Sequence, residues 1–150
     1  MKRDPALIPL SQQHHNGLAL CVLTDRELDA GADREAIVRL ADRIVGVWDV
    51  ELTNHFEMEE QILFPACPAN LSALVQQLLQ EHRLVRELVE RLRRKPDEKT
   101  LRDFTALLRR HIRLEENELF EKAQREISRD ILDKIGADIG KKAVRICLKP

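Results

Sequence analysis

One short motif occurs twice in the chain, and this repeat constrains the fold more than any other feature. Residues 55–65 read HFEMEEQILFP, and residues 111–120, which begin 56 positions later, read HIRLEENELF. Each copy places a histidine four residues before a glutamate, as His55 with Glu59 and His111 with Glu115. On an α-helix these two side chains lie on one face, with about 6 Å between their Cβ atoms. One helix can therefore offer a metal ion both an imidazole nitrogen and a carboxylate oxygen, and two copies predict two ions.

Both histidine–glutamate pairs lie in the middle of an apolar helical stripe. Steps of three and four positions around the first pair meet Ile37, Ala41, Ile44, Trp48, Leu52 and Ile62. The same steps around the second pair meet Leu101, Phe104, Leu108 and Leu119. The pairs are therefore predicted to point into a core. A carboxylate there costs several kcal/mol or takes up a proton unless it has a partner, and a bound metal is the most economical partner.

Two other histidines stand alone on apolar stripes. His14 lies at helical spacing from Leu10, Leu18 and Cys21, whereas the steps from His15 meet mostly polar or small residues. His14 is therefore predicted to point inward, and His15 to lie at the surface or beside a ligand. His82 occupies the centre of the row Leu71, Val75, Leu78, Val85, Val89 and Leu92. The chain thus reads twice as a helix with a lone histidine followed by a helix with a His-x-x-x-Glu pair.

This order predicts a pseudo-two-fold dinuclear site. Its six candidate ligands are His14, His55, Glu59, His82, His111 and Glu115. Six ligands are too many for one tetrahedral zinc ion, so both glutamates are expected to bridge a pair of ions. The alternative for any one histidine is a hydrogen-bonded core residue, which is the commoner role. Four histidines, one on each helix at nearly one level, favour the metal site.

The remaining polar and aromatic residues of the motifs receive other roles. The neighbouring carboxylates are expected on a solvated face or as hydrogen-bond partners of the ligands: Glu57, Glu60, Glu116 and Glu118. Glu116 is the substitute for Glu115 if the helix is locally distorted. The aromatic residues are expected to form core packing, and those near the ligands to keep water out: Trp48, Phe56, Phe64, Phe104 and Phe120. Cys21 is expected to be a small core residue.

The composition indicates an all-α protein. The chain has 5 glycines in 150 residues and no tyrosine, and its β-branched residues never alternate. Turn signals near residues 30–33, 65–70 and 95–97 predict an antiparallel, up-down-up-down four-helix bundle over about residues 9–127. Residues 128–150 are expected to add a short helix, over about 128–135, and a basic tail. We expect a single domain over residues 1–150.

Charge and cysteine content exclude several classes of protein. The 26 acidic and 25 basic residues nearly cancel, so neither nucleic acid nor a membrane is an expected partner. The cysteines are Cys21, Cys67 and Cys147, an odd number with wide spacing, which predicts neither a disulfide framework nor a thiolate zinc site. The first ten residues contain two prolines and no run long enough for a signal or spanning helix, so we expect a cytoplasmic protein.

Taken together, the motifs resemble those of the hemerythrin-like, or HHE cation-binding, domains. The resemblance covers about residues 7–127 and includes both longer motifs, the Glu81-His82 pair and the opening Leu-Ser-Gln-Gln-His-His of residues 10–15. It implies an antiparallel four-helix bundle with a non-haem di-iron centre. On the matching positions, the implied ligands are the same six residues that the helical faces indicate.

The chain departs from the oxygen-carrying members of that family at two positions. Those members usually have a second histidine one turn after the ligand of the third helix, where this chain has Arg86. Their last carboxylate is typically an aspartate five residues after its histidine, where this chain has Glu115 at four. Both differences argue against reversible oxygen carriage. A missing histidine leaves an open position that suits oxygen, nitric oxide or peroxide chemistry, or iron sensing.

Three functions fit these features. The first is a di-iron protein that senses, carries or buffers oxygen, nitric oxide or iron; the second is a di-iron enzyme that reduces peroxide or nitric oxide or oxidises a small substrate. The third is a metal-free helical interaction module. The sequence contains no phosphate loop, no nucleophile with a paired base and no basic stripe, which favours the first. It sets neither the native metal, for which zinc, cobalt and manganese are alternatives to iron, nor the oligomeric state.

Overall fold

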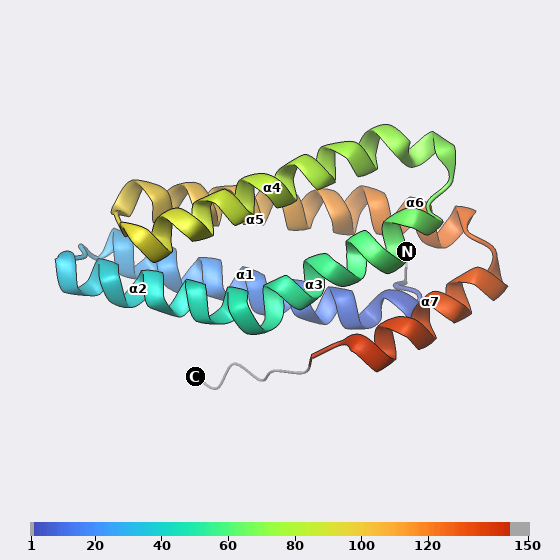
Figure 1. Ribbon diagram of the computed structural model, residues 1–150, viewed down its shortest axis with the longest axis horizontal. Helices are drawn as coiled ribbons and strands as arrows, with labels where there is room; N and C mark the ends of the chain where they lie inside the picture. The colour runs from blue at the N-terminus through green and yellow to red at the C-terminus, as the bar shows by residue number, and fades with distance from the viewer. Residues whose placement is uncertain (1, 145–150) are drawn as a thin grey trace.

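The structure, a computed structural model, describes residues 2–144 and contains helices and no strand within that range (Figure 1). The all-α prediction is therefore confirmed. After a 3₁₀ turn, Pro5–Leu7, the α-helices are α1 Ile8–Asp29, α2 Arg34–Val47, α3 Thr53–Met58, α4 Ser72–Arg94, α5 Glu98–Leu114, α6 Phe120–Glu126 and α7 Arg129–Lys142. Within the described residues, no helix is both long and apolar enough to cross a membrane.

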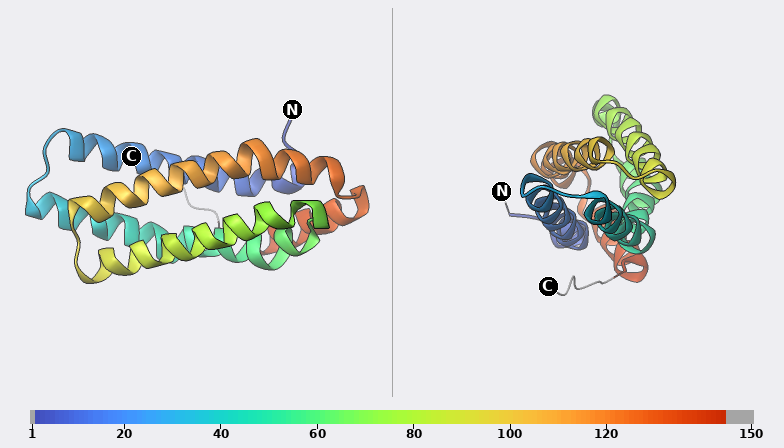
Figure 2. Two further views of the ribbon diagram at one scale, coloured as in Figure 1. Left: turned by 90° about the horizontal axis from the view of Figure 1, so that it is seen from above. Right: turned by 90° about the vertical axis from the view of Figure 1, so that its left-hand side faces the viewer.

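The long helices lie side by side as a helical bundle (Figures 1 and 2). Helix α1 packs along α5, α5 packs along α4, and α4 packs along α2. The α1–α2 and α4–α5 turns lie at one end of the bundle, and the connection from α3 to α4 lies at the other (Figure 1). The bundle therefore places the middle of each long helix next to the middle of its neighbours.

The helix ends follow from local chemistry. The Asp33 carboxylate accepts a hydrogen bond from the Ala36 amide at 2.9 Å, and Asp97 accepts one from the Thr100 amide at 2.7 Å, which caps α2 and α5. Helix α1 stops before Gly31, whose φ of 91° needs a residue without a Cβ. The turn near residues 30–33 was predicted. Helix α4 follows the 3₁₀ turn Ala69–Leu71 and has no side-chain cap.

The second and fourth predicted helices are continuous rods, but they are not uniform α-helices. The α2–α3 rod contains π-helical turns at Trp48–Leu52 and Glu59–Leu63, and the α5–α6 rod contains one at Glu115–Leu119. A π turn holds more residues than an α turn, so it delays the return of the next side chain to the core. For this reason Leu63 is fully buried and Ile62, the predicted core residue, is half-buried. The prediction of regular α-helix through both motifs was wrong at these turns.

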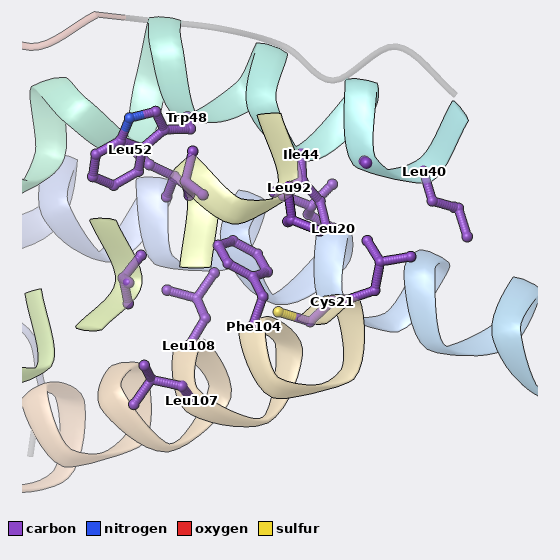
Figure 3. Close-up of a cluster of buried hydrophobic side chains, with 14 of the residues drawn as sticks. Leu20, Cys21, Leu40, Ile44, Trp48, Leu52, Leu92, Phe104, Leu107 and Leu108 are labelled. Atoms are coloured by element: carbon purple, nitrogen blue, oxygen red, sulfur yellow. The ribbon is translucent and has the colours of Figure 1, made fainter. Parts of the chain in front are cut away.

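Two clusters of buried apolar side chains lie on either side of the predicted site. One cluster, part of which is shown in Figure 3, includes Leu20, Leu52, Phe56, Val85 and Leu108. The other includes Leu10, Met58, Leu78, Leu119 and Phe120. On each of the four rods, the predicted ligand histidine falls between a residue of one cluster and a residue of the other. The apolar stripes are thus confirmed as core, with a polar layer between two apolar ones.

The C-terminal helix is longer than predicted. The sequence predicted a helix over about 128–135, but α7 continues through Gly136 and Gly140 to Lys142. Burial of Leu132, Ile135 and Ile139 against the N-terminal end of the bundle outweighs the low helix propensity of glycine. The predicted basic tail extends to Pro150, and residues 145–150 lie outside the described range.

The two glycines of α7 provide a matched test of this packing. A Cβ at Gly136 would lie 3.0 Å from the Ala6 Cα, whereas a Cβ at Gly140 would meet nothing within 4 Å. We therefore expect Gly140→Ala to raise the free energy of unfolding by about 0.5–1 kcal/mol. Gly136→Ala should lower it, because the backbone of Ala6 must move. Urea unfolding of both variants measures the difference, and equal stabilisation would contradict a close α7 contact.

Candidate metal centre

The structure brings all six predicted side chains together in two overlapping groups. One group comprises His14, His55, Glu59 and Glu115, and the other comprises Glu59, His82, His111 and Glu115. In each group, one donor atom from every residue lies within 4.8 Å of the others, and every residue is buried. The two glutamates belong to both groups. This is the arrangement expected of two cation positions that share two bridging carboxylates.

Each carboxylate lies near histidines of two different rods. Glu59 Oε1 is 3.1 Å from His55 Nε2 of its own rod and 3.4 Å from His82 Nε2 of α4. Glu115 contacts His111 Nε2 of its own rod, and its other oxygen is 3.9 Å from His14 Nε2 of α1. The pseudo-two-fold relation predicted from the repeated motifs is therefore visible in the packing. Both glutamates also open a π-helical turn, so the α spacing to the histidine is kept and the distortion follows it.

Hydrogen bonds determine which nitrogen of three imidazoles carries the proton. His82 Nδ1 lies 2.6 Å from Glu60, and His111 Nδ1 lies 2.8 Å from Glu81. A carboxylate only accepts, so each Nδ1 donates. His55 Nδ1 lies 2.9 Å from Gln13 Oε1, and the Gln13 nitrogen is occupied by acceptors, so this Nδ1 also donates. In the neutral rings, the three Nε2 atoms then present lone pairs to the centre.

The donor atoms that face the centre fit a bound cation. Within residues 2–144, the Nε2 atoms of the four histidines and both oxygens of the two glutamates are buried and have no hydrogen-bond partner. Buried polar atoms are almost always paired, so this concentration is unusual. Lone pairs that face one another repel, and a cation between them replaces that repulsion with attraction. Imidazole nitrogen with carboxylate oxygen suits iron, zinc, cobalt or manganese.

The protonation states also favour a cation. Burial, with a contribution from the charge of His55, lowers the pKa of His14 to about 4, so its ring is neutral at pH 7. Burial opposes ionisation of Glu59, but its electrostatic interactions with the neighbouring His55 and His82 hold the pKa of this carboxyl below its ordinary value. A metal needs neutral imidazole and ionised carboxylate, and these two residues supply both.

Aromatic rings enclose the imidazoles. Phe56 stacks on His82 with 3.8 Å between ring centroids, and Phe64 lies on the same imidazole at 5.6 Å. Phe120 stacks on His14 at 5.3 Å. These residues were predicted as core packing, and their contact with the ligand rings means that they also exclude water from the centre.

The other predictions for the motif residues can be compared with the structure. His15 is exposed, as predicted, and Cys21 is a buried core residue whose thiol pKa burial raises to about 12. Glu60 is a hydrogen-bond partner of His82, and Glu116 lies 3.5 Å from His14 Nδ1, whereas Glu118 lies on the exposed face. Glu116 does not replace Glu115, which is one of the clustered carboxylates.

Two residues that hold the ligands were missed in the sequence. Gln13 accepts from His55, and Glu81 accepts from His111. Each directly precedes a lone histidine in the chain, which places it on the flank of the helix toward the neighbouring rod. A polar residue next to a buried histidine was the available signal, and only the packing of the helices identifies its partner.

The comparisons with known proteins agree with this geometry. A family model described as the hemerythrin HHE cation binding domain matches residues 9–123, a range that contains all six clustered residues. No curated protein and no solved structure matches the chain.

The shared carboxylates generate a prediction about metal content. Glu115 belongs to both groups of donors. When metal-free protein is loaded with cobalt(II), Glu115→Ala should therefore weaken binding at both positions and retain less than one ion per chain. Glu118→Ala, in the same helical turn but exposed, should retain the wild-type content. Metal analysis after gel filtration measures the difference. Retention of both ions by Glu115→Ala would exclude a shared carboxylate.

The unpaired donor atoms also predict that metal stabilises the fold. We expect each position that fills to add about 2.7 kcal/mol to the unfolding free energy at a free cobalt(II) concentration one hundred times the dissociation constant of that position. Chemical unfolding with and without metal measures the gain. The Glu115→Ala variant is the control, and its unfolding free energy should rise little. If metal does not change the unfolding free energy of the wild-type protein, the proposed metal site is wrong.

Proposed function

Because the chain belongs to the hemerythrin family of HHE cation-binding domains, we propose that it is a non-haem di-iron protein that senses, carries or buffers oxygen, nitric oxide or iron. In this proposal His14 and His55 would hold one iron, His82 and His111 would hold the other, and Glu59 and Glu115, which belong to both donor groups, would be shared. The iron pair would supply reversible electron transfer and a position for a small ligand. The protein side chains orient the donors and exclude water.

The observation that carries this proposal is the concentration of buried donor atoms without hydrogen-bond partners. Four imidazole nitrogens and two carboxylates face one another between two apolar clusters. A metal-free interaction module would have no reason to keep them, since replacing buried charges with apolar side chains commonly costs no stability. The cost of burying these groups is offset when they bind cations.

Arg86 supports a small-ligand function over a closed structural site. Its guanidinium lies 3.0 Å from Glu60 and 5.7 Å from the centroid of the Phe56 ring, outside the groups of donor atoms. Each cation then has two histidines and two shared carboxylates, and iron accepts more ligands than that. The remaining coordination positions suit oxygen, nitric oxide or peroxide.

The proposal extends to the organisation of the chain. We propose that residues 1–150 form one hemerythrin-like domain, that its bundle over about residues 9–127 has antiparallel, up-down-up-down topology, and that α7 covers one end of the bundle. The turns at alternate ends of the bundle support this topology. We further propose that neither nucleic acid nor a membrane is a partner, because the charges nearly balance. A cytoplasmic location is also part of the proposal.

Exposure of the iron-loaded protein to small molecules tests the function. After anaerobic loading with iron(II), we expect visible charge-transfer bands to appear when oxygen or nitric oxide is admitted. The Glu115→Ala variant should show neither. Sustained consumption of peroxide or nitric oxide would favour the enzyme alternative. A protein that binds no iron would favour the interaction module.

A further inference from the structure

The pseudo-two-fold relation of the ligands extends to the residues that hold them. Glu60 and Glu116 are 56 positions apart, as are the two bridging glutamates, and Gln13 and Glu81 each directly precede a lone histidine. Each of these four residues lies beside the Nδ1 atom of one ligand histidine. The relation is broken at one pair, because a neutral amide at residue 13 corresponds to a carboxylate at residue 81.

The histidines of one cation position are both held by carboxylates. His82 Nδ1 donates to Glu60 at 2.6 Å, and His111 Nδ1 donates to Glu81 at 2.8 Å. These are the short distances of charge-assisted hydrogen bonds. A carboxylate acceptor on Nδ1–H draws the proton away from the ring, so the opposite nitrogen becomes a stronger metal donor.

The histidines of the other cation position are held more weakly. His55 Nδ1 donates to the neutral amide oxygen of Gln13 at 2.9 Å. His14 Nδ1 is 3.5 Å from Glu116 Oε2 and forms no hydrogen bond, and the same oxygen accepts from the Ser11 hydroxyl at 2.9 Å. Neither imidazole therefore gains the donor strength that a short carboxylate bond provides.

From this asymmetry we infer that the two cation positions are inequivalent, with a tight position at His82 and His111 and a weak, exchangeable position at His14 and His55. The inference rests on the proposed dinuclear site and adds the order in which it fills. Mutation of such supporting residues typically changes metal affinity by 10–100-fold, so a difference of at least about tenfold between the positions is expected.

The C-terminal segment explains why residue 13 is an amide. The Gln13 nitrogen donates to the Val144 carbonyl at 3.2 Å and to Asn54 Oδ1 at 3.1 Å. Asn54 in turn donates to the Lys142 carbonyl and accepts from the Val144 amide. A glutamate at residue 13 would direct an oxygen at two acceptors. The end of α7 thus selects a neutral partner for His55 and makes that position the weaker one.

Inequivalent positions would give the protein a half-loaded state. Over the range of metal concentration between the two dissociation constants, the His82/His111 position holds an ion and the His14/His55 position exchanges its ion with solution. Such a state follows the concentration of free iron, which suits the sensing or buffering branch of the proposed function. Two equivalent positions would fill together and have no such range.

A titration of metal-free protein with cobalt(II) tests the order of filling. Isothermal calorimetry should resolve two binding steps of one ion each. Their dissociation constants should differ by at least tenfold after correction for the statistical factor. Proton NMR of selectively labelled protein should show the contact shifts of a coordinated ring at the Nδ1–H signals of His82 and His111 at one equivalent, and at that of His55 only near the second. Equal constants, or a contact shift at His55 in the first step, would overturn the inference.

Variants that keep the size of the side chain separate donor strength from packing. Glu81→Gln and Glu60→Gln should weaken the first step about tenfold or more and leave the second within a few-fold. Glu116 is the pseudo-two-fold counterpart of Glu60. Glu116→Gln should weaken the second step much less than Glu60→Gln weakens the first, since the contact of Glu116 with His14 is long. Glu87→Gln is exposed on α4 and controls for lost charge. Equal weakening of both steps by Glu81→Gln would also overturn the inference.

The same titration distinguishes failure of the inference from failure of the proposed function. Two ions that bind with one constant would leave the dinuclear site intact and remove only the inequivalence. Binding of a single ion, or none, would contradict both, because the shared carboxylates would then not hold a pair. Circular dichroism shows whether each variant keeps its helices. If either Glu60→Gln or Glu81→Gln fails to fold, the other variant still tests the first step.

Discussion

Mutual repulsion between buried lone pairs is the interaction on which the rest of this protein depends. Four imidazoles and two carboxylates face one another in the middle of a helical bundle, and their inward atoms have no hydrogen-bond donors. Aromatic rings and two apolar clusters enclose the layer and limit the access of water that would relieve this repulsion. A core of this kind is costly by itself and becomes favourable when it binds a cation. Metal binding and the stability of the fold are therefore coupled.

Along each helix, the residues that pack the bundle and the residues that offer metal donors lie at different levels. The apolar residues above and below the polar layer hold the rods together, and the layer itself contributes donors and little packing. The π-helical turns that begin at Glu59 and Glu115 keep the spacing of each histidine–glutamate pair and then return Leu63 and Leu119 to the core. Distortion of the helix therefore lies beside the donors, where π turns are often found.

The residues around the donors form hydrogen bonds and ion pairs that differ between the two halves of the site. Arg86 pairs with Glu60, which in turn holds His82, so the arginine supports a ligand from outside the donor groups. Gln13 joins His55 to the end of α7, so the C-terminal segment is part of the site's surroundings. A shared ligand set can thus be tuned through its hydrogen-bond partners, which differ between the two halves.

The sequence by itself determined the helices and the six clustered residues, because both follow from local periodicity: a four-residue step places His55 over Glu59 whatever surrounds them. It also indicated that His14, and not His15, points inward. The tertiary structure alone decided which polar residue holds which ligand, where the π turns lie, and how far α7 extends. These depend on side chains far apart in the chain: Glu81 meets His111 only when α4 packs along α5, and α7 continues past Gly136 because Leu132, Ile135 and Ile139 are buried against the bundle.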